Sequence, residues 1–233
     1  MEKDPGRFCG PGLFILGIQV REKRDMVKRS IVVGIAGGSA SGKSTVVREL
    51  VRLLLPHESS VLSHDAYYHD LSYLPFEHRI EINVDHPDSL ETLLLIEHVG
   101  SLLAGREIEV PSYDYVSQTR SQPGVHVTPA PVVIIEGLLV LCHPALRALM
   151  DLAVFVDASE AARLRRRIAR DVLERGRSES EVVEQHHARV QPMHDEFVEP
   201  SRRSADLIVP RGGHNQAAVE ALAGQVRALL RGA

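Results

Sequence analysis

The sequence lacks features that several classes of protein require. It contains no tryptophan, only 4% of its 233 residues are aromatic, and just two cysteines occur, Cys9 and Cys142. Two distant cysteines supply neither a disulfide framework nor the paired spacing of a zinc site, so we expect a reducing, cytoplasmic location. Scarce aromatic side chains argue against a stacking platform for single-stranded nucleic acid. The formal net charge of −4 argues against a nucleic-acid-binding surface.

Long apolar runs are also missing. Residues 13–20 form an early apolar run that is far shorter than the roughly 20 residues needed to span a bilayer. Charged residues 21–25 follow without a small-residue cleavage site, which argues against a signal peptide and a membrane partner. We interpret residues 1–28 as a disordered N-terminal extension, with Met26 as an alternative start. Residues 29–233 have a length that suits a single domain.

Segments typical of strands alternate with segments typical of helices. Short apolar runs predict buried strands at residues 31–36, 60–63, 132–135, 152–156 and 207–209. Apolar residues at helical spacing predict helices at residues 44–55, 89–104, 161–174, 179–190 and 216–230. This alternation predicts an α/β fold with a mostly parallel sheet covered by helices on both faces. Residues 107–127 instead predict a β-hairpin insertion over one end of the sheet, with its turn at residues 121–124.

A phosphate-binding loop is the strongest motif. Residues 37–44 read GGSASGKS, which fits G-x-x-x-x-G-K-[ST] between a predicted strand and a predicted helix. Successive backbone N–H groups of such a loop, and the helix N-terminus behind it, attract phosphate. We expect Lys43 to reach the β- and γ-phosphates of ATP and Ser44 to bind Mg²⁺. The predicted nucleotide-binding residues are Gly37, Gly38, Ser39, Ala40, Ser41, Gly42, Lys43, Ser44 and Thr45.

Several kinds of enzyme share this loop. No base-reading Asn-Lys-x-Asp stretch of a GTPase is present, and the chain is short for a mechanical ATPase. Small-molecule kinases therefore remain as the predicted class.

Three acidic residues follow predicted strands. Asp65 lies at the sheet edge where ligands bind in open α/β folds. Its carboxylate suits a general base for an attacking hydroxyl, or a cap of a helix or turn, and the pattern alone leaves both open. Glu136 and Asp157 compete for a place beside Ser44 at the metal. Since Asp157 begins a stretch with capping-box-like spacing, we predict Asp157 as a helix cap and Glu136 as a metal-site residue.

An arginine-rich segment, residues 163–177, predicts a helical lid. Its helix has an arginine stripe and an apolar stripe, and we expect the apolar stripe to pack while the arginines face phosphate. The stripes are Arg163, Arg167 and Arg170 on one side and Leu164, Ile168 and Val172 on the other. A solvated basic face is the alternative. The adjacent His186 and His187 are expected on different helix faces, as surface or packing residues and not as a metal site.

Seven motifs in order resemble the uridine kinase (uridine–cytidine kinase) family of P-loop nucleoside kinases, from about residue 31 to the C-terminus. They are GGSASGKS at 37–44, DAYY at 65–68, DHPD at 85–88, PSYDY at 111–115, EGLL at 136–139, RDVLERGR at 170–177 and ADLIVPRGG at 205–213. The resemblance implies transfer of the γ-phosphate of ATP to the 5′-hydroxyl of uridine or cytidine, giving UMP or CMP in pyrimidine salvage. It also implies Mg²⁺ and a homotetramer.

The resemblance implies a role for each matching residue. Asp65 is the implied general base, while Arg170, Arg175 and Arg177 are implied to face the phosphates. The implied nucleoside contacts are Tyr68, Asp85 through the ribose hydroxyls, Tyr113 against the base, Arg167 and Gln185. From the residues alone, two blander alternatives stay open. Residues 85–88 could be a turn in which Asp88 or Ser89 caps the next helix, and Tyr113 could be a half-buried strand residue.

Gln118 departs from the family pattern. The family often has histidine there, touching the pyrimidine edge. An amide presents both a donor and an acceptor, so Gln118 leaves the choice between uracil and cytosine open.

Two other functions compete with nucleoside phosphorylation. One is a related P-loop kinase acting on ribulose 5-phosphate or pantothenate, although a phosphorylated acceptor calls for more basic residues near Asp65. The other is a non-catalytic nucleotide-sensing or RNA-binding module that uses the arginine helix. The net negative charge and the complete set of Lys43, Ser44, Asp65 and Glu136 argue against that module.

Overall fold

The structure, a computed structural model, describes residues 30–54, 58–79, 81–212 and 215–233. The predicted extension, residues 1–28, lies outside these ranges. Within them, the helices are too short or too polar to cross a membrane.

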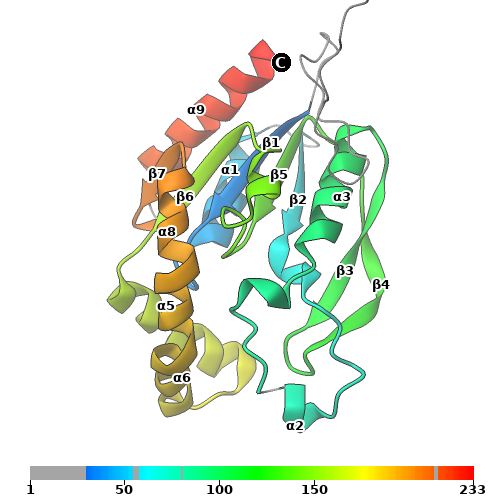
Figure 1. The fold of residues 1–233 in the computed structure, drawn as a ribbon. Coiled ribbons are helices and arrows are strands. Elements are labelled where there is room, and N and C mark those ends of the chain that lie inside the picture. The colour runs from blue at the N-terminus through cyan, green and yellow to red at the C-terminus, as the bar shows by residue number, and fades with distance from the viewer. Residues whose placement is uncertain (1–29, 55–57, 80, 213–214) are drawn as a thin grey trace, which may run out of the picture.

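A five-stranded sheet forms the centre of the molecule (Figure 1). Its strands are β1 (Ile31–Ala36), β2 (Ser59–Ser63), β5 (Val132–Glu136), β6 (Leu152–Asp157) and β7 (Leu207–Pro210). They run in the order β2-β5-β1-β6-β7, and every pairing is parallel, which confirms the predicted parallel sheet. Because β5 lies between β1 and β2, the carboxyl ends of these three strands meet at one edge of the sheet.

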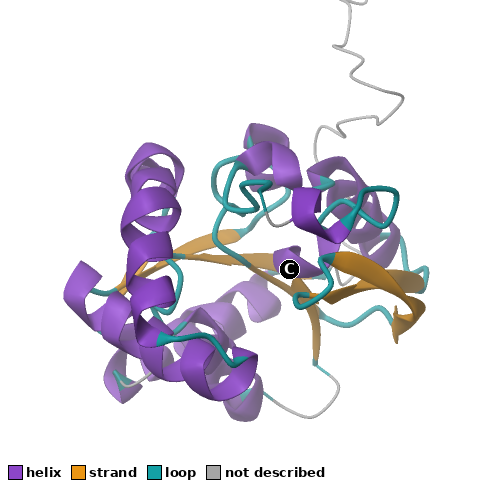
Figure 2. Ribbon diagram, turned by 90° about the horizontal axis from the view of Figure 1, so that it is seen from below, coloured by secondary structure: helices purple, strands orange, loops and turns teal. Residues whose placement is uncertain are grey.

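Helices cover both faces of the sheet (Figure 2). Helices α1 (Lys43–Leu53) and α9 (Gln216–Gly232) cover one face, and α3 (Thr92–Leu103) and α4 (Pro144–Arg147) cover the other. Alternate residues of β1 supply the two cores: Val33 and Ile35 pack on the side of α1 and α9, whereas Val32 packs on the side of α3. This alternation is the period of two expected for a strand buried on both faces.

The predicted hairpin is confirmed, but its turn is not where we expected it. Strands β3 (Ile108–Asp114) and β4 (Thr119–Val127) pair antiparallel beside α3, and the turn lies at residues 115–118. Residues 121–124, predicted as the turn, lie inside β4. The pairing register shifts there, between Val110 and Ser112 on the facing strand. A bulge of this kind accommodates the Pro-Gly pair that otherwise signals a turn.

Short elements lead into the larger helices. They are η1 (His64–Tyr67), α2 (Phe76–Arg79) and η2 (Pro87–Ser89). The helix predicted from residue 89 therefore begins three residues later, at Thr92.

The arginine-rich helix is α5 (Glu160–Arg175), and the helix that follows is longer than predicted. Beyond α6 (Glu179–Gln185), the chain continues through η3 (His186–Val190), α7 (Gln191–Met193), η4 (His194–Val198), α8 (Glu199–Ser201) and η5 (Arg202–Ser204). The predicted end at Val190 was therefore wrong. Pro192 and Pro200 each remove a helical donor, and a π-helical turn (η3, η4) ends two residues before each of them. The wider π turn lets the helix pass a proline without breaking.

Candidate active site

A cavity of about 340 Å³ lies at the edge of the sheet where β1, β2 and β5 end. All of the predicted site residues line it except Gly37, Gly38 and Ser41, which lie within the phosphate loop behind its surface. The lining residues that we predicted are Ser39, Ala40, Gly42, Lys43, Ser44, Thr45, Asp65, Tyr68, Asp85, Tyr113, Gln118, Glu136, Arg167, Arg170, Arg175, Arg177 and Gln185. The structure thus brings together side chains spread over almost 150 positions of sequence.

The phosphate loop has a conformation that depends on glycine. Gly37 has a φ of 146°, and a Cβ there would lie 2.5 Å from the carbonyl oxygen of Val156. The Lys43 ammonium is buried and donates to the carbonyl oxygens of Gly37 and Gly38, at 3.0 and 3.1 Å. Burial lowers the pKa of Lys43, while the nearby Glu136 and Asp65 carboxylates act in the opposite direction. A cation is therefore held between the loop and two acids.

Asp65 is free of any capping role. It lies in η1, where Ser63 occupies the N-cap position, and so the capping alternative for Asp65 is wrong. The pKa of Asp65 is raised to about 6, mainly by burial; Lys43 opposes this rise, and the Glu136 and Asp85 carboxylates contribute to it. A carboxyl group with this pKa is ionised near neutral pH and still accepts a proton readily.

Glu136 and Asp157 have different surroundings. Glu136 ends β5 opposite Ser63 of β2, and the Ser63 hydroxyl donates to its Oε1 at 3.1 Å. Asp157 does not cap α5, whose N-cap is Ser159, so that prediction was wrong. Strand β6 extends through Asp157 and directs its carboxylate to Arg202, with 3.1 Å from Nη2 to Oδ2. Of the two acids, only Glu136 lines the cavity.

Three tyrosines form one wall of the cavity. The ring centroids of Tyr68 and Tyr113 lie 5.1 Å apart, and those of Tyr113 and Tyr115 lie 5.4 Å apart. The Tyr113 hydroxyl and Gln118 Oε1 are buried and have no hydrogen-bond partner among the described residues. Gln118 adopts a left-handed φ of 54° in the hairpin turn. Buried polar atoms of this kind usually find a partner, so both are available to a ligand.

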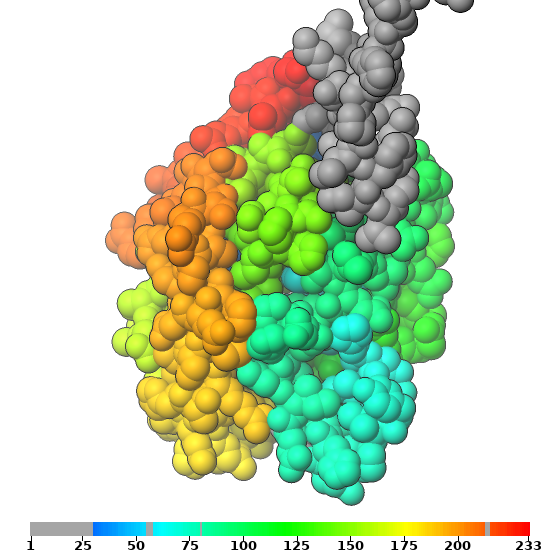
Figure 3. Space-filling view, in the orientation of Figure 1, coloured from blue at the N-terminus to red at the C-terminus, as the bar shows by residue number. Residues whose placement is uncertain are grey.

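Asp85 faces this wall from a separate loop. Burial raises the pKa of Asp85, and Arg167 and Arg175 oppose that effect. The alternative in which Asp88 or Ser89 caps the next helix was wrong, because Glu91 is the N-cap of α3. Within the loop, His86 is the N-cap of η2 and accepts from the Asp88 N–H at 3.2 Å. The ring of His86 also contacts that of Phe197, with 5.1 Å between centroids. This contact joins the α2–α3 region to the helical stretch from α6 to α8, and the two meet on the face seen in Figure 3.

Sequence reasoning missed the residue that anchors the hairpin. Arg120, on β4, donates to the Tyr68 carbonyl oxygen at 3.0 Å and to Glu91 Oε2 at 2.8 Å. It therefore ties the tyrosine wall to η1. A single arginine in a strand carries no motif, and only the folded contact identifies it.

The arginine helix turns its charged side inward, and its predicted apolar stripe is buried only in part: Leu164 and Ile168 are half-buried, and Val172 is exposed. Arg163, Arg167 and Asp171 are buried, whereas Val172 and Leu173 are 43% and 85% exposed. The reason is Asp171, whose carboxylate has no exposed surface and collects four guanidinium groups. The distances from Asp171 are 2.8 Å to Arg170 Nε, 3.4 Å to Arg167 Nε, 3.5 Å to Arg175 Nη1 and 3.8 Å to Arg177 Nη1.

Gln185 completes this cluster. Its Oε1 accepts from Arg167 Nη2 and from Arg177 Nη1, each at 2.7 Å. Arg167 and Gln185, implied by the resemblance as nucleoside contacts, therefore bind one another in this structure. The alternative of a solvated basic face is wrong, since Arg167, Arg170, Arg175 and Arg177 line the cavity and share the buried carboxylate of Asp171.

Seven further residues line the cavity and were not predicted. They are Ile82, Asn83, Val84, Tyr115, Leu138, Arg166 and Arg189. Arg166 donates to the Ser41 carbonyl oxygen at 3.0 Å, and so α5 also contacts the phosphate loop. Arg175 lies 5.3 Å over the ring of Tyr115, a cation–π contact that joins α5 to the hairpin. Arg166 lies within the arginine-rich segment and Tyr115 within the PSYDY motif, so the signal for both was present.

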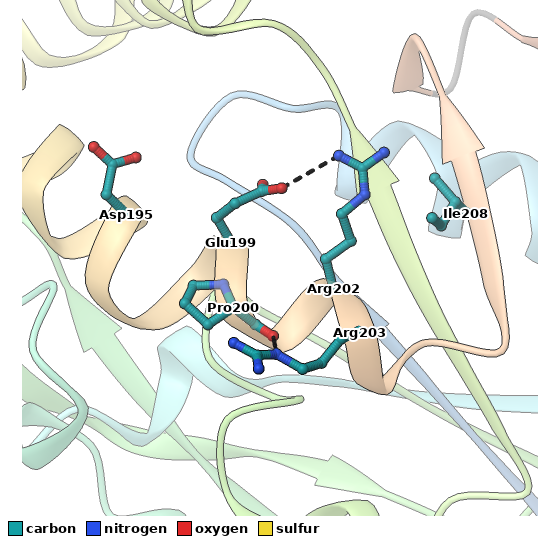
Figure 4. Close-up of a pocket in the computed structure, with 6 residues that line it drawn as sticks. All are labelled: Asp195, Glu199, Pro200, Arg202, Arg203 and Ile208. Atoms are coloured by element: carbon teal, nitrogen blue, oxygen red, sulfur yellow. Dashed lines mark hydrogen bonds and ion pairs between the residues drawn. The ribbon is translucent and has the colours of Figure 1, made fainter.

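A second hollow, of about 550 Å³, is more open and shares no lining residue with the first (Figure 4). Asp195, Glu199, Pro200, Arg202, Arg203 and Ile208 line it. Arg202 is already paired with Glu199 at 3.2 Å and with Asp157 at 3.1 Å. None of the residues that line this hollow has a buried polar atom without a partner, in contrast to Tyr113 and Gln118 of the first cavity.

Comparison with known proteins agrees with this geometry. A family model described as "Phosphoribulokinase / Uridine kinase family" matches residues 32–218. The chain belongs to this family. Members of it with a P-loop use a nucleotide, ATP, as phosphate donor, and this kinase carries the loop in full. Among curated relatives, the uridine kinase of Ligilactobacillus salivarius is 47% identical over 203 residues, which cover 87% of this chain and 95% of the relative. The uridine kinase of Bacillus subtilis is 46% identical over 205 residues, or 88% and 97% of the two chains.

Solved structures share the fold of this kinase at low sequence identity. A proposed fructose transport system kinase from Silicibacter sp. TM1040 gives a TM-score of 0.66 at 22% identity, covering 81% of this chain and 93% of that one. D-glycerate 3-kinase from Cryptococcus neoformans gives a TM-score of 0.56 at 15% identity, and the match covers 82% of this chain and 89% of that one. At such identities the likeness extends to the fold alone.

Proposed function

We propose that this kinase transfers the γ-phosphoryl group of ATP to the 5′-hydroxyl of uridine or cytidine, giving UMP or CMP for pyrimidine salvage. The observation that carries the proposal is the 340 Å³ cavity, in which the phosphate loop, Asp65 and the tyrosine wall face one another. The curated relatives named uridine kinase, at 46–47% identity over most of the chain, support the same substrate class.

Asp65 takes the proton of the attacking hydroxyl in this proposal. The oxygen then forms a bond to the γ-phosphorus as the bond from that phosphorus to the β-bridging oxygen breaks, which releases ADP. The raised pKa of Asp65, about 6, supports this role because a base works best when its pKa lies near the operating pH. Lys43 and the arginines Arg170, Arg175 and Arg177 neutralise the charge on the phosphoryl oxygens.

The residues present fit a magnesium ion. Ser44 and Glu136 both line the cavity, and hydroxyl and carboxylate oxygens are the donors that Mg²⁺ prefers. The hydrogen bond from Ser63 leaves Glu136 with free lone pairs and holds the direction of its carboxylate. When bound, Mg²⁺ supplies charge neutralisation on the phosphates. We propose Ser44 and Glu136 as the residues that hold it, directly or through water.

The acceptor end of the cavity supports an uncharged sugar. Asp65 and Asp85 both line this end and are half-buried, and two carboxylates would repel a phosphorylated acceptor such as ribulose 5-phosphate. Asp85 suits the ribose hydroxyls, and Tyr68 and Tyr113 offer ring faces to the base. The unpaired Oε1 of Gln118 and hydroxyl of Tyr113 are free to bond the pyrimidine edge. Arg167 and Gln185 reach the nucleoside by exchanging their present contact for one with the ligand.

The proposal includes a homotetramer in the cytoplasm, on the basis of the resemblance. Light scattering on the purified chain tests the assembly: a mass near four times 25.7 kDa supports it, and a monomer contradicts it.

Replacement of Asp65 tests the proposed chemistry. Asp65→Asn keeps the shape and removes the base, so kcat for uridine should fall by ~10²–10⁴ while ATP binding is retained. Asp88→Asn is the matched control, since its carboxylate is 91% exposed on η2. A panel of nucleosides, ribulose 5-phosphate and pantothenate in a coupled ADP assay identifies the acceptor. An Asp65→Asn variant within about threefold of the parent contradicts Asp65 as the base.

A further inference from the structure

Outside the proposed active site, one buried histidine lacks partners. The side chain of His186 is 1% exposed, and neither of its ring nitrogens has a hydrogen-bond partner among the described residues. A neutral imidazole carries one N–H and one lone pair, and leaving both unsatisfied in the interior is unfavourable. No role in the proposed reaction accounts for this residue.

Two exposed side chains complete a cluster around His186. Glu160, the first residue of α5, has its Oε1 3.6 Å from His186 Nε2. The rings of His186 and His187 lie 5.3 Å apart between centroids, at 75°. One ligand atom from each of Glu160, His186 and His187 falls within 4.8 Å of the others. His186 is buried and His187 is exposed, as expected for adjacent residues on different helix faces, yet a ring nitrogen of each comes within reach of the same point. They begin the π-helical turn η3, whose geometry departs from that of a regular α-helix.

These separations suit a small divalent cation. Bonds of about 2.0–2.1 Å in a tetrahedral site separate neighbouring ligand atoms by roughly 3.3–3.5 Å. The 3.6 Å between His186 Nε2 and Glu160 Oε1 already matches this spacing closely. The side chains of His187 and Glu160 are exposed and can rotate, which brings their ligand atoms from within 4.8 Å of the others to the shorter spacing of a metal site. Water supplies the fourth ligand.

The surroundings also limit which ion binds. Arg163 and Arg167 lie close enough to His186 to oppose a cation. Hard ions that prefer oxygen, such as Mg²⁺, gain little from two imidazoles and do not overcome this repulsion. Late first-row divalent ions gain strongly from imidazole nitrogen.

We propose that Glu160, His186 and His187 form a binding site for a late first-row divalent cation such as Zn²⁺, which cross-links the start of α5 to η3. The site is separate from the proposed magnesium position and independent of the proposed function. Arg163 and Arg167 follow Glu160 on the same helix, so the cation fixes the base of the arginine helix.

Zinc titration of the full chain tests the site. After chelator treatment, Zn²⁺ is added in the calorimeter with excess Mg²⁺ present, so that the oxygen-rich positions are already occupied. We expect one Zn²⁺ per chain, and at least tenfold weaker binding in His187→Ala and in Glu160→Gln. Both side chains are exposed, so neither variant should disturb folding. We also expect Zn²⁺ to raise the Tm of the parent and not that of the two variants.

A matched control excludes adventitious binding to a surface histidine. His126 lies 3.6 Å from Glu107, the same separation as in the proposed site, but the described residues offer this pair no third ligand. His126→Ala should therefore bind Zn²⁺ as the parent does. Equal affinities in His187→Ala and His126→Ala, or no stoichiometric binding in the parent, would overturn the proposal.

Discussion

Replacement of Asp171 by asparagine perturbs the arginine cluster at its centre. The carboxylate is fully buried, and Arg170, Arg167, Arg175 and Arg177 approach it at 2.8, 3.4, 3.5 and 3.8 Å. Asn has nearly the same shape but carries no charge, so four guanidinium groups lose their shared counter-ion. The change therefore isolates the charge of Asp171 from its packing.

The structure sets the size of the effect. Removing one partner of a buried ion pair typically costs ~3–5 kcal/mol. The side chains of three of the arginines are 28–33% exposed, so water screens part of their charge. We therefore expect the free energy of unfolding to fall by about 2–3 kcal/mol. For a domain of this size, a change of 1 kcal/mol in the free energy of unfolding shifts Tm by ~2–4 °C, so we expect Tm to fall by ~4–12 °C.

Nucleotide should partly reverse this loss. Without Asp171 the arginines still need an anion, and the phosphates of ATP provide one. ATP should therefore raise the Tm of Asp171→Asn more than that of the parent, while kcat falls about tenfold because the arginines are no longer held in position. Calorimetric Tm values with and without ATP, combined with kcat and KM for ATP, measure both effects.

Glu174→Gln is the control, because Glu174 is an exposed acid on the same helix. Its Tm, kcat and response to ATP should match those of the parent. An Asp171→Asn protein with a Tm within about 1 °C of the parent and the same response to ATP would refute the reasoning.

Three further predictions concern the cavity itself. Lys43→Ala should lower kcat by ~10²–10³, because it removes a donor to the transferred phosphate. Tm should not fall, since burial already disfavours the charged form of this side chain. Near-normal turnover would contradict the phosphate-loop assignment. Because the base must be ionised, kcat/KM for the nucleoside should rise with pH to a plateau above the Asp65 pKa of about 6, and this limb should vanish in Asp65→Asn. The kcat/KM values for uridine and cytidine should differ by less than about tenfold, or ~1.4 kcal/mol, because Oε1 of the Gln118 amide has no partner and the amide can present either end to the base. A hundredfold ratio of these values, or a ratio that Gln118→His leaves unchanged, would count against this.

The sheet and the phosphate loop could be predicted because their signals are local. Strand β1 is an apolar run, and the residue after it, Gly37, has a backbone conformation that residues with a side chain rarely adopt. The strand order depends on which runs pair, and no local pattern contains it. That order brings Glu136 beside Ser63. The choice of Glu136 over Asp157 rested instead on a capping spacing at Asp157, which the structure does not bear out, although Glu136 does line the cavity.

Proline and glycine misled the prediction where tertiary contacts override them. The Pro-Gly pair at 123–124 signals a turn, yet it lies inside β4 because the hairpin continues through a bulge. Pro192 and Pro200 signal helix ends, yet π turns carry the helix past both. In each case the segment is held by long-range contacts, such as Arg120 to Glu91 and His86 to Phe197, which a local pattern does not contain.

The incomplete burial of the apolar stripe of α5 has a more general reason. Amphipathic reasoning assumes that a helix covers an apolar core, so that its apolar stripe turns inward. Helix α5 instead covers a cavity that must bind phosphate, and there the side chains in need of burial are the ones that supply counter-charge. Asp171 makes this orientation stable by giving the arginines a buried acceptor while no phosphate is present, and Leu173 is left at the surface as a result. In this chain, the acid within the arginine-rich stretch is therefore the sequence feature that accounts for the inward-facing side of α5.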